Sequence, residues 1–125
     1  MKLSIATLST MLVLTSALFR AQSKGNDCIM AVTYSEIAFK DFKNAFKTDK
    51  PDDVRDNTER AVKSAAEAAA FSNICNCPLA KNYALNAVTF GNKALKETDL
   101  KTQKKLIKKA MDMSLDVMTA TPSCK

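Results

Sequence analysis

The sequence predicts an all-α protein, an antiparallel four-helix bundle made of two tandem αα-hairpins that are each closed by a disulfide. Apolar and small residues recur at helical spacing in four segments. The chain has only two glycines, three prolines and no tryptophan, which favours helices over a β-sandwich. All four cysteines also fall at matching positions of an internal repeat.

The first two helices are predicted over residues 27–48 and from Pro51 onward. In the first, Ala31, Ala38 and Ala45 share one face. Pro51 suits the first turn of the second helix, where its missing amide hydrogen has no cost. The second helix carries a heptad seam of mostly small residues, which favours close helix packing: Val54, Thr58, Ala61, Ala65, Ala68, Ser72 and Cys75.

Proline and aspartate also mark the helix ends in the second half of the chain. A third helix is predicted to begin at Pro78. Asp99 is expected to cap a fourth helix, which Pro122 ends. Four amphipathic helices with short turns most economically form an up-down-up-down bundle.

A shift of 49 residues superimposes the two halves of the sequence. It aligns all four cysteines and both tyrosines. The identical pairs are Cys28/Cys77, Ala31/Ala80, Tyr34/Tyr83, Ala38/Ala87, Ala45/Ala94, Lys47/Lys96, Ala61/Ala110 and Cys75/Cys124. Residues 28–75 and 77–124 are therefore interpreted as two copies of one hairpin, joined through Asn76.

The repeat selects among the three possible cysteine pairings. In an up-down-up-down bundle all four cysteines lie at one pole, so Cys28–Cys75 and Cys77–Cys124 would close each hairpin identically. Each bond would close a loop of roughly 48 residues and stabilise the fold by about 4 kcal/mol. A Cys75–Cys77 bond, with its partner bond joining the first and last helices, is the less favoured alternative.

Residues 1–23 are predicted to be a cleaved signal peptide, followed by the four-helix domain at 24–125. A basic start precedes an apolar run of 17 residues and the small-residue site Ala21-Gln22-Ser23. An uncleaved anchor is less favoured, because a spanning helix needs about 20 residues. The protein is expected to be secreted or periplasmic, where disulfides persist. The mature chain would carry 17 basic and 13 acidic residues, a net charge of about +4.

The sequence offers little for catalysis, so a non-enzymatic protein without cofactor or metal is predicted. Histidine is absent, which excludes His-dependent triads and His-based acid–base chemistry. The pair Cys75 and Cys77 could form a redox dithiol, and four cysteines could bind zinc, but two structural disulfides are favoured. Acids around the start of the second helix, from Asp49 to Glu59, are expected to serve the helix dipole.

Five lysines on one side of the fourth helix form the strongest charge feature: Lys101, Lys104, Lys105, Lys108 and Lys109. They are the predicted partner-binding residues, and an ordinary solvated face is the competing interpretation. The predicted function is a protein-interaction, inhibitor or immunity-type module. Its partner is an unidentified protein that could be anionic, with no nucleic acid and no stable membrane insertion. The alternatives are a carrier of a small apolar ligand between the hairpins, or a Cys-x-Cys thiol–disulfide enzyme.

Overall fold

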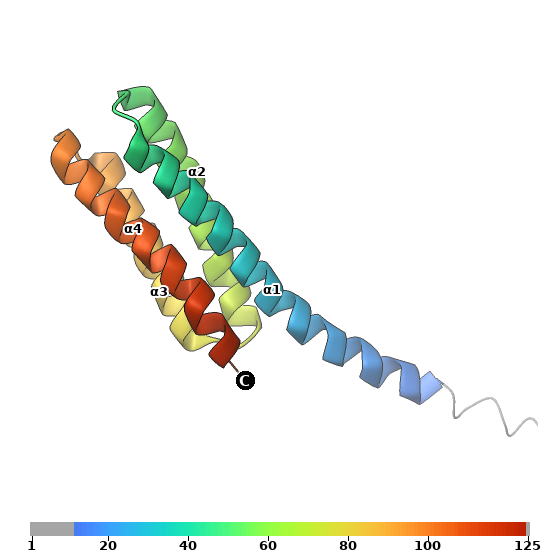
Figure 1. Ribbon diagram of the computed structural model, residues 1–125. Helices are drawn as coiled ribbons and strands as arrows, with labels where there is room; N and C mark the ends of the chain where they lie inside the picture. The colour runs from blue at the N-terminus through green and yellow to red at the C-terminus, as the bar shows by residue number, and fades with distance from the viewer. Residues whose placement is uncertain (1–11, 125) are drawn as a thin grey trace, which may run out of the picture.

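Four helices pack as an antiparallel bundle in the computed structural model, which describes the backbone of residues 12–124 and the side chains of residues 28–124 (Figure 1). The helices are α1 (Leu12–Lys47), α2 (Pro51–Ile74), α3 (Pro78–Lys96) and α4 (Leu100–Ala120), followed by the short 3-10 helix η1 (Thr121–Ser123). Each helix packs on two neighbours, α1 on α2 and α4, and α3 on α2 and α4. The predicted fold class is confirmed.

Helix α1 begins about 15 residues earlier than the predicted start near residue 27. It extends beyond the bundle (Figure 1). Residues 12–27 contain no proline, and the one glycine there, Gly25, weakens a helix by only ~1 kcal/mol. Residues 1–11 of the predicted signal peptide lie outside the described residues. In the part of the chain that the structure describes, no helix has the length and apolar character needed to cross a membrane.

Helices α2, α3 and α4 begin at the residues that the sequence predicts. Pro51 and Pro78 each occupy the first residue of a helix. Asp99 caps α4 by accepting a hydrogen bond from the Thr102 amide at 2.9 Å and from the Thr102 hydroxyl at 2.7 Å. These two hydrogen bonds lower the pKa of Asp99 below its usual value, and the bond from the Thr102 hydroxyl has the larger effect. Asn76 joins the hairpins with a left-handed φ of 58°, a conformation that asparagine tolerates well.

The core consists mainly of alanines on the faces that the sequence predicts. Six residues of the seam along α2 are buried, from Val54 to Ser72. The predicted alanine positions of α1 and α3 are buried as well, including Ala38 and Ala87. Small side chains let the four helices approach closely, because little volume separates their backbones.

At an offset of 49 residues, the two hairpins match in the helix boundaries around their turns and in much of their burial. Helices α1 and α3 end at Lys47 and Lys96, and α2 and α4 begin at Pro51 and Leu100. Matched positions are buried in both copies even where their chemistry differs. These pairs include Ser35/Ala84, Phe42/Gly91, Thr58/Ile107, Ala65/Ser114, Ala68/Val117 and Ser72/Thr121.

Phe42 is the largest fully buried side chain, and it fills space that Gly91 leaves open. A Cβ atom at position 91 would lie 3.1 Å from two atoms of the Phe42 ring and closer still to a methyl group of Val62. The bulky side chain of one hairpin therefore occupies the gap at the matching position of the other. Positions 42 and 91, which the repeat matches, are therefore complementary in volume.

Buried hydroxyl groups in the helices bond to the preceding turn. Thr58, Ser72, Ser114 and Thr121 each donate to the carbonyl four residues earlier, at 2.6–3.0 Å. Such bonds satisfy a polar group inside an apolar core. Ser35 differs, because its Oγ is buried and has no hydrogen-bond partner among the described residues.

Candidate functional site

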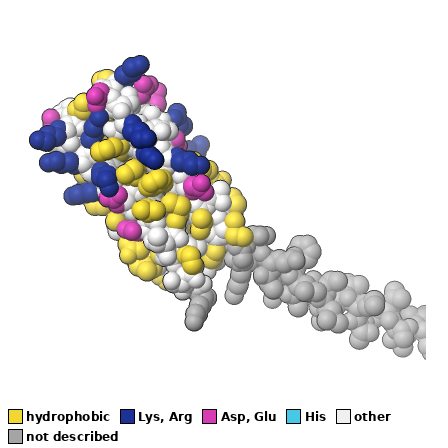
Figure 2. All heavy atoms as spheres, in the orientation of Figure 1, with side chains coloured by type: hydrophobic (Ala, Val, Ile, Leu, Met, Phe, Trp, Pro, Cys, Tyr) yellow, Lys and Arg dark blue, Asp and Glu magenta, His cyan; other side chains and the backbone are white. Residues whose placement is uncertain are grey.

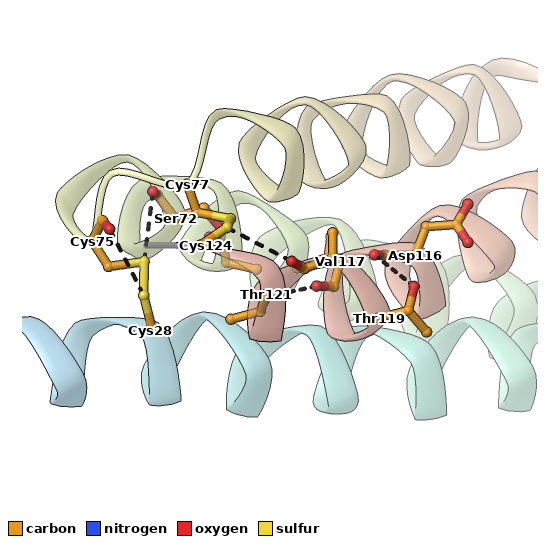
Figure 3. The surroundings of a disulfide bond; sticks show 11 residues. Cys28, Ser72, Cys75, Cys77, Asp116, Val117, Thr119, Thr121 and Cys124 are labelled. Atoms are coloured by element: carbon orange, nitrogen blue, oxygen red, sulfur yellow. Dashed lines mark hydrogen bonds between the residues drawn. A yellow bond between two sulfur atoms is a disulfide. The ribbon is translucent and has the colours of Figure 1, made fainter.

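The two disulfides lie together at the pole where the chain passes from α2 to α3. Cys28 of α1 is bonded to Cys75, and Cys77 is bonded to Cys124, with Cα–Cα distances of 5.4 and 5.3 Å. Figure 3 shows Cys75 and Cys77 on either side of the turn, directed toward their separate partners. The predicted pairing is confirmed and the Cys75–Cys77 alternative is wrong.

At this end of the bundle, the cysteine pole, all four cysteine sulfurs take part in disulfides. A redox dithiol at Cys75 and Cys77 would first require both hairpin disulfides to be reduced. Within residues 28–124, no three side chains of the usual metal-ligating types come together. Disulfides of this kind are typical of the oxidising extracellular space or periplasm.

The opposite pole holds the five predicted lysines, and the structure brings all of them to one groove. The basic groove has a volume of about 520 Å³ and is lined by Lys101, Lys104, Lys105, Lys108, Lys109 and Phe46. The lysines lie on the first three turns of α4, while Phe46 comes from the last turn of α1. The predicted residues therefore form one continuous surface.

Phe46 gives the groove an apolar element that the sequence analysis missed. Its side chain is 37% exposed, and the Lys104 ammonium lies 6.0 Å from its ring centroid. Lys104 also forms an ion pair with Asp49 in the turn between α1 and α2. This contact joins the two hairpins at the turn pole, the end of the bundle that carries the α1–α2 and α3–α4 turns. It also holds Lys104 beside the aromatic ring.

The other lysines differ in whether a carboxylate of the same chain neutralises them. Lys108 forms an ion pair with Asp112, one turn later on α4, at 2.6 Å. Lys101, Lys105 and Lys109 form no ion pair with any residue in the described range. Because these three cations share the groove and form no ion pair, the potential in the groove is positive. A positive potential attracts anionic groups.

A second aromatic extends the basic surface toward α3. The Lys109 and Lys93 ammonium groups lie 5.5 and 5.9 Å from the ring centroid of Phe90, within cation–π range. Phe90 is half-buried and packs against the core. Its matching position in the first hairpin is Asp41, so only the second hairpin builds this surface.

The acids at the start of α2 make local contacts. The Arg55 guanidinium bridges Asp52 at 3.1 Å and Asp56 at 3.7 Å. Figure 2 shows charged side chains gathered toward the turn pole, with hydrophobic ones more frequent toward the cysteine pole. The described part of this face therefore has a charged end and a less charged end.

The space between the hairpins is filled by side chains. Phe42, Ile107 and the alanines of all four helices form a packed cluster there. Three grooves of the described residues are lined in part by exposed side chains, such as Lys101, Lys63 and Ile29. These grooves lie at the surface of the bundle.

The basic groove is therefore the strongest candidate site of the described chain. It combines uncompensated cations with an exposed aromatic, and the disulfides at the far pole hold the hairpins that form it. No protein-family model matches the chain, and no curated protein or solved structure matches it significantly.

Proposed function

We propose that the protein is an exported, non-catalytic binding module that engages an acidic surface of a protein partner through the basic groove. One observation carries the proposal: five lysines and Phe46 line a single groove, and three of those lysines form no ion pair with a carboxylate of the described residues. The disulfides and the predicted signal peptide support export.

A protein partner suits the groove better than a nucleic acid does. All five cations are lysines, and the groove contains no arginine, whose planar fork recognises phosphate bidentately. Phe46 offers an apolar contact of the kind that anchors a side chain at a protein interface. Acidic residues around one apolar anchor are the complementary surface.

The experiment uses fluorescence anisotropy with a labelled oligoglutamate peptide that carries one central leucine. Each exposed ion pair contributes about 0.2–1 kcal/mol, so replacing Lys101, Lys105 and Lys109 with Gln should weaken binding by about 3- to 160-fold. Binding should also fall as salt rises, because the screening length shortens from ~10 Å at 0.1 M to ~3 Å at 1 M.

The matched control changes Lys40, Lys43 and Lys47 to Gln. These three lysines are exposed on α1 and line no part of the groove. The control lowers the net charge by the same amount, so a weakened affinity confined to the α4 variant supports the groove. Equal losses in both variants, or no binding at 0.1 M salt, contradict the proposal. Tighter binding of a single-stranded oligonucleotide of equal charge would contradict the choice of a protein partner.

A further inference from the structure

The outward faces of α2 and α4 carry opposite charges at equivalent positions. The 49-residue offset matches seven charged residues of α2 with charged residues of α4. The sign is kept at Arg55/Lys104, Arg60/Lys109 and Glu67/Asp116. It reverses at four pairs, which are Asp52/Lys101, Asp56/Lys105, Glu59/Lys108 and Lys63/Asp112. Seven of these side chains are exposed, and Asp112 is 48% exposed.

The fold places these faces on opposite sides of the bundle. Helices α2 and α4 each pack on α1 and α3, so they occupy diagonal corners. Both run from the turn pole toward the cysteine pole, and both follow a turn of three residues. The matched residues of the two faces therefore lie at equivalent heights along the bundle axis.

We propose that the acidic face of α2 is the docking surface for the basic face of α4 in a second copy of this chain. The inference rests on the proposed function, because it names the acidic surface that the lysines bind. A sideways displacement of one copy places α2 of one molecule parallel to α4 of the next. All four reversed pairs then meet in register.

The fourth pair is what favours a second copy over another anionic partner. The row of lysines on α4 is followed by Asp112, which would repel a uniformly acidic surface. The acidic row on α2 is followed by Lys63, which meets that aspartate. Charge complementarity thus extends over these four pairs, including the position where the sign changes, and the like-charged pairs Arg55/Lys104, Arg60/Lys109 and Glu67/Asp116 oppose it.

The contact is heterologous, because each molecule uses a different face toward each neighbour. Such contacts produce open chains unless a rotation closes them into a ring. The association is weak, since the charges are exposed and since Arg55, Arg60, Lys104 and Lys109 beside the two rows all carry the same sign. Arg55, Arg60 and Lys104 each have a carboxylate within their own chain, which reduces that repulsion.

Sedimentation velocity of the purified, disulfide-bonded protein tests the inference. The weight-average sedimentation coefficient should rise with protein concentration at 0.1 M salt and become independent of concentration at 1 M. Two charge-reversed variants provide the sharper arm. One changes Lys101, Lys105 and Lys108 to Glu, and the other changes Asp52, Asp56 and Glu59 to Lys.

Each variant alone carries like charges on both faces, so each should remain monomeric at 0.1 M salt. An equimolar mixture should regain the concentration dependence, because every face then meets its opposite. Circular dichroism verifies that both variants fold, and Gln replacements at the same positions serve if a reversed variant does not. The Gln variants should lose the concentration dependence.

Three results would overturn the inference: a sedimentation coefficient independent of concentration at 0.1 M, association that persists at 1 M, or a mixture that stays monomeric. The peptide assay is performed at concentrations below any association. If the peptide binds and the chain does not self-associate, only this inference fails. If neither occurs, the proposed function fails as well.

Discussion

Replacing Gly91 with Ala should destabilise the bundle, although helix propensity alone predicts the opposite. Gly91 lies in the interior of α3, where alanine is favoured over glycine by about 0.8–1 kcal/mol. The added methyl group would approach the Phe42 ring at 3.1 Å and overlap a methyl group of Val62. Valine is stiff about χ1, and Phe42 is fully buried, so neither side chain moves away easily.

The magnitude follows from the difference between these two effects. Overpacking a core typically costs about 1–3 kcal/mol, which exceeds the gain in helix propensity. We expect a net loss of about 1 kcal/mol in the free energy of unfolding. For a domain of about 100 residues, that loss lowers the melting temperature by roughly 4–8 °C.

Thermal unfolding followed by circular dichroism measures the change. Asn92→Ala is the matched control, because Asn92 is exposed on the same helix and the variant should gain a few tenths of a kcal/mol. Combining Gly91→Ala with Val62→Ala should recover part of the loss, since it removes the overlapping methyl group. A melting temperature raised by Gly91→Ala would refute the close packing of the two hairpins at this position.

Three further predictions follow from the buried and capping groups. Ser35→Ala should stabilise the protein by about 1 kcal/mol and raise its urea midpoint, because it removes a buried hydroxyl that has no partner among the described residues. Alanine is also the residue at the matching position 84. A lower midpoint would show that the hydroxyl is satisfied. Removing either disulfide by paired Cys→Ser changes should lower the free energy of unfolding by about 4 kcal/mol, and by similar amounts for both, because each bond joins residues 47 apart. Clearly unequal urea midpoints of the two variants would refute the equivalence of the hairpins. The folded pKa of Asp99 is lowered, so its capping contribution to stability is present above the unfolded pKa of about 4 and is lost as pH falls through the folded pKa. The difference in melting temperature between wild type and Asp99→Ala should therefore be largest near pH 7 and should close at lower pH. A difference independent of pH would rule out the charged cap.

The sequence by itself determined the helices, their inward faces and the cysteine pairing. Local signals define these features, because a proline or a capping aspartate fixes a helix start and the period of small residues fixes the buried face. The pairing came from the 49-residue repeat, since two equivalent hairpins require equivalent disulfides. The five lysines were predicted because their spacing places them on one side of a single helix.

Only the tertiary structure decided what surrounds those lysines. Phe46 and Asp49 are more than fifty residues from Lys104 along the chain, and they meet it because α1 packs beside α4. The start of α1 was mispredicted, since the helix was expected to begin near residue 27 and the backbone is helical from Leu12 onward. Periodicity within one helix fixes which side faces the core. Which residues of neighbouring helices meet depends on helix rotation, axial offset and side-chain volume, and these are set only when the four helices pack together.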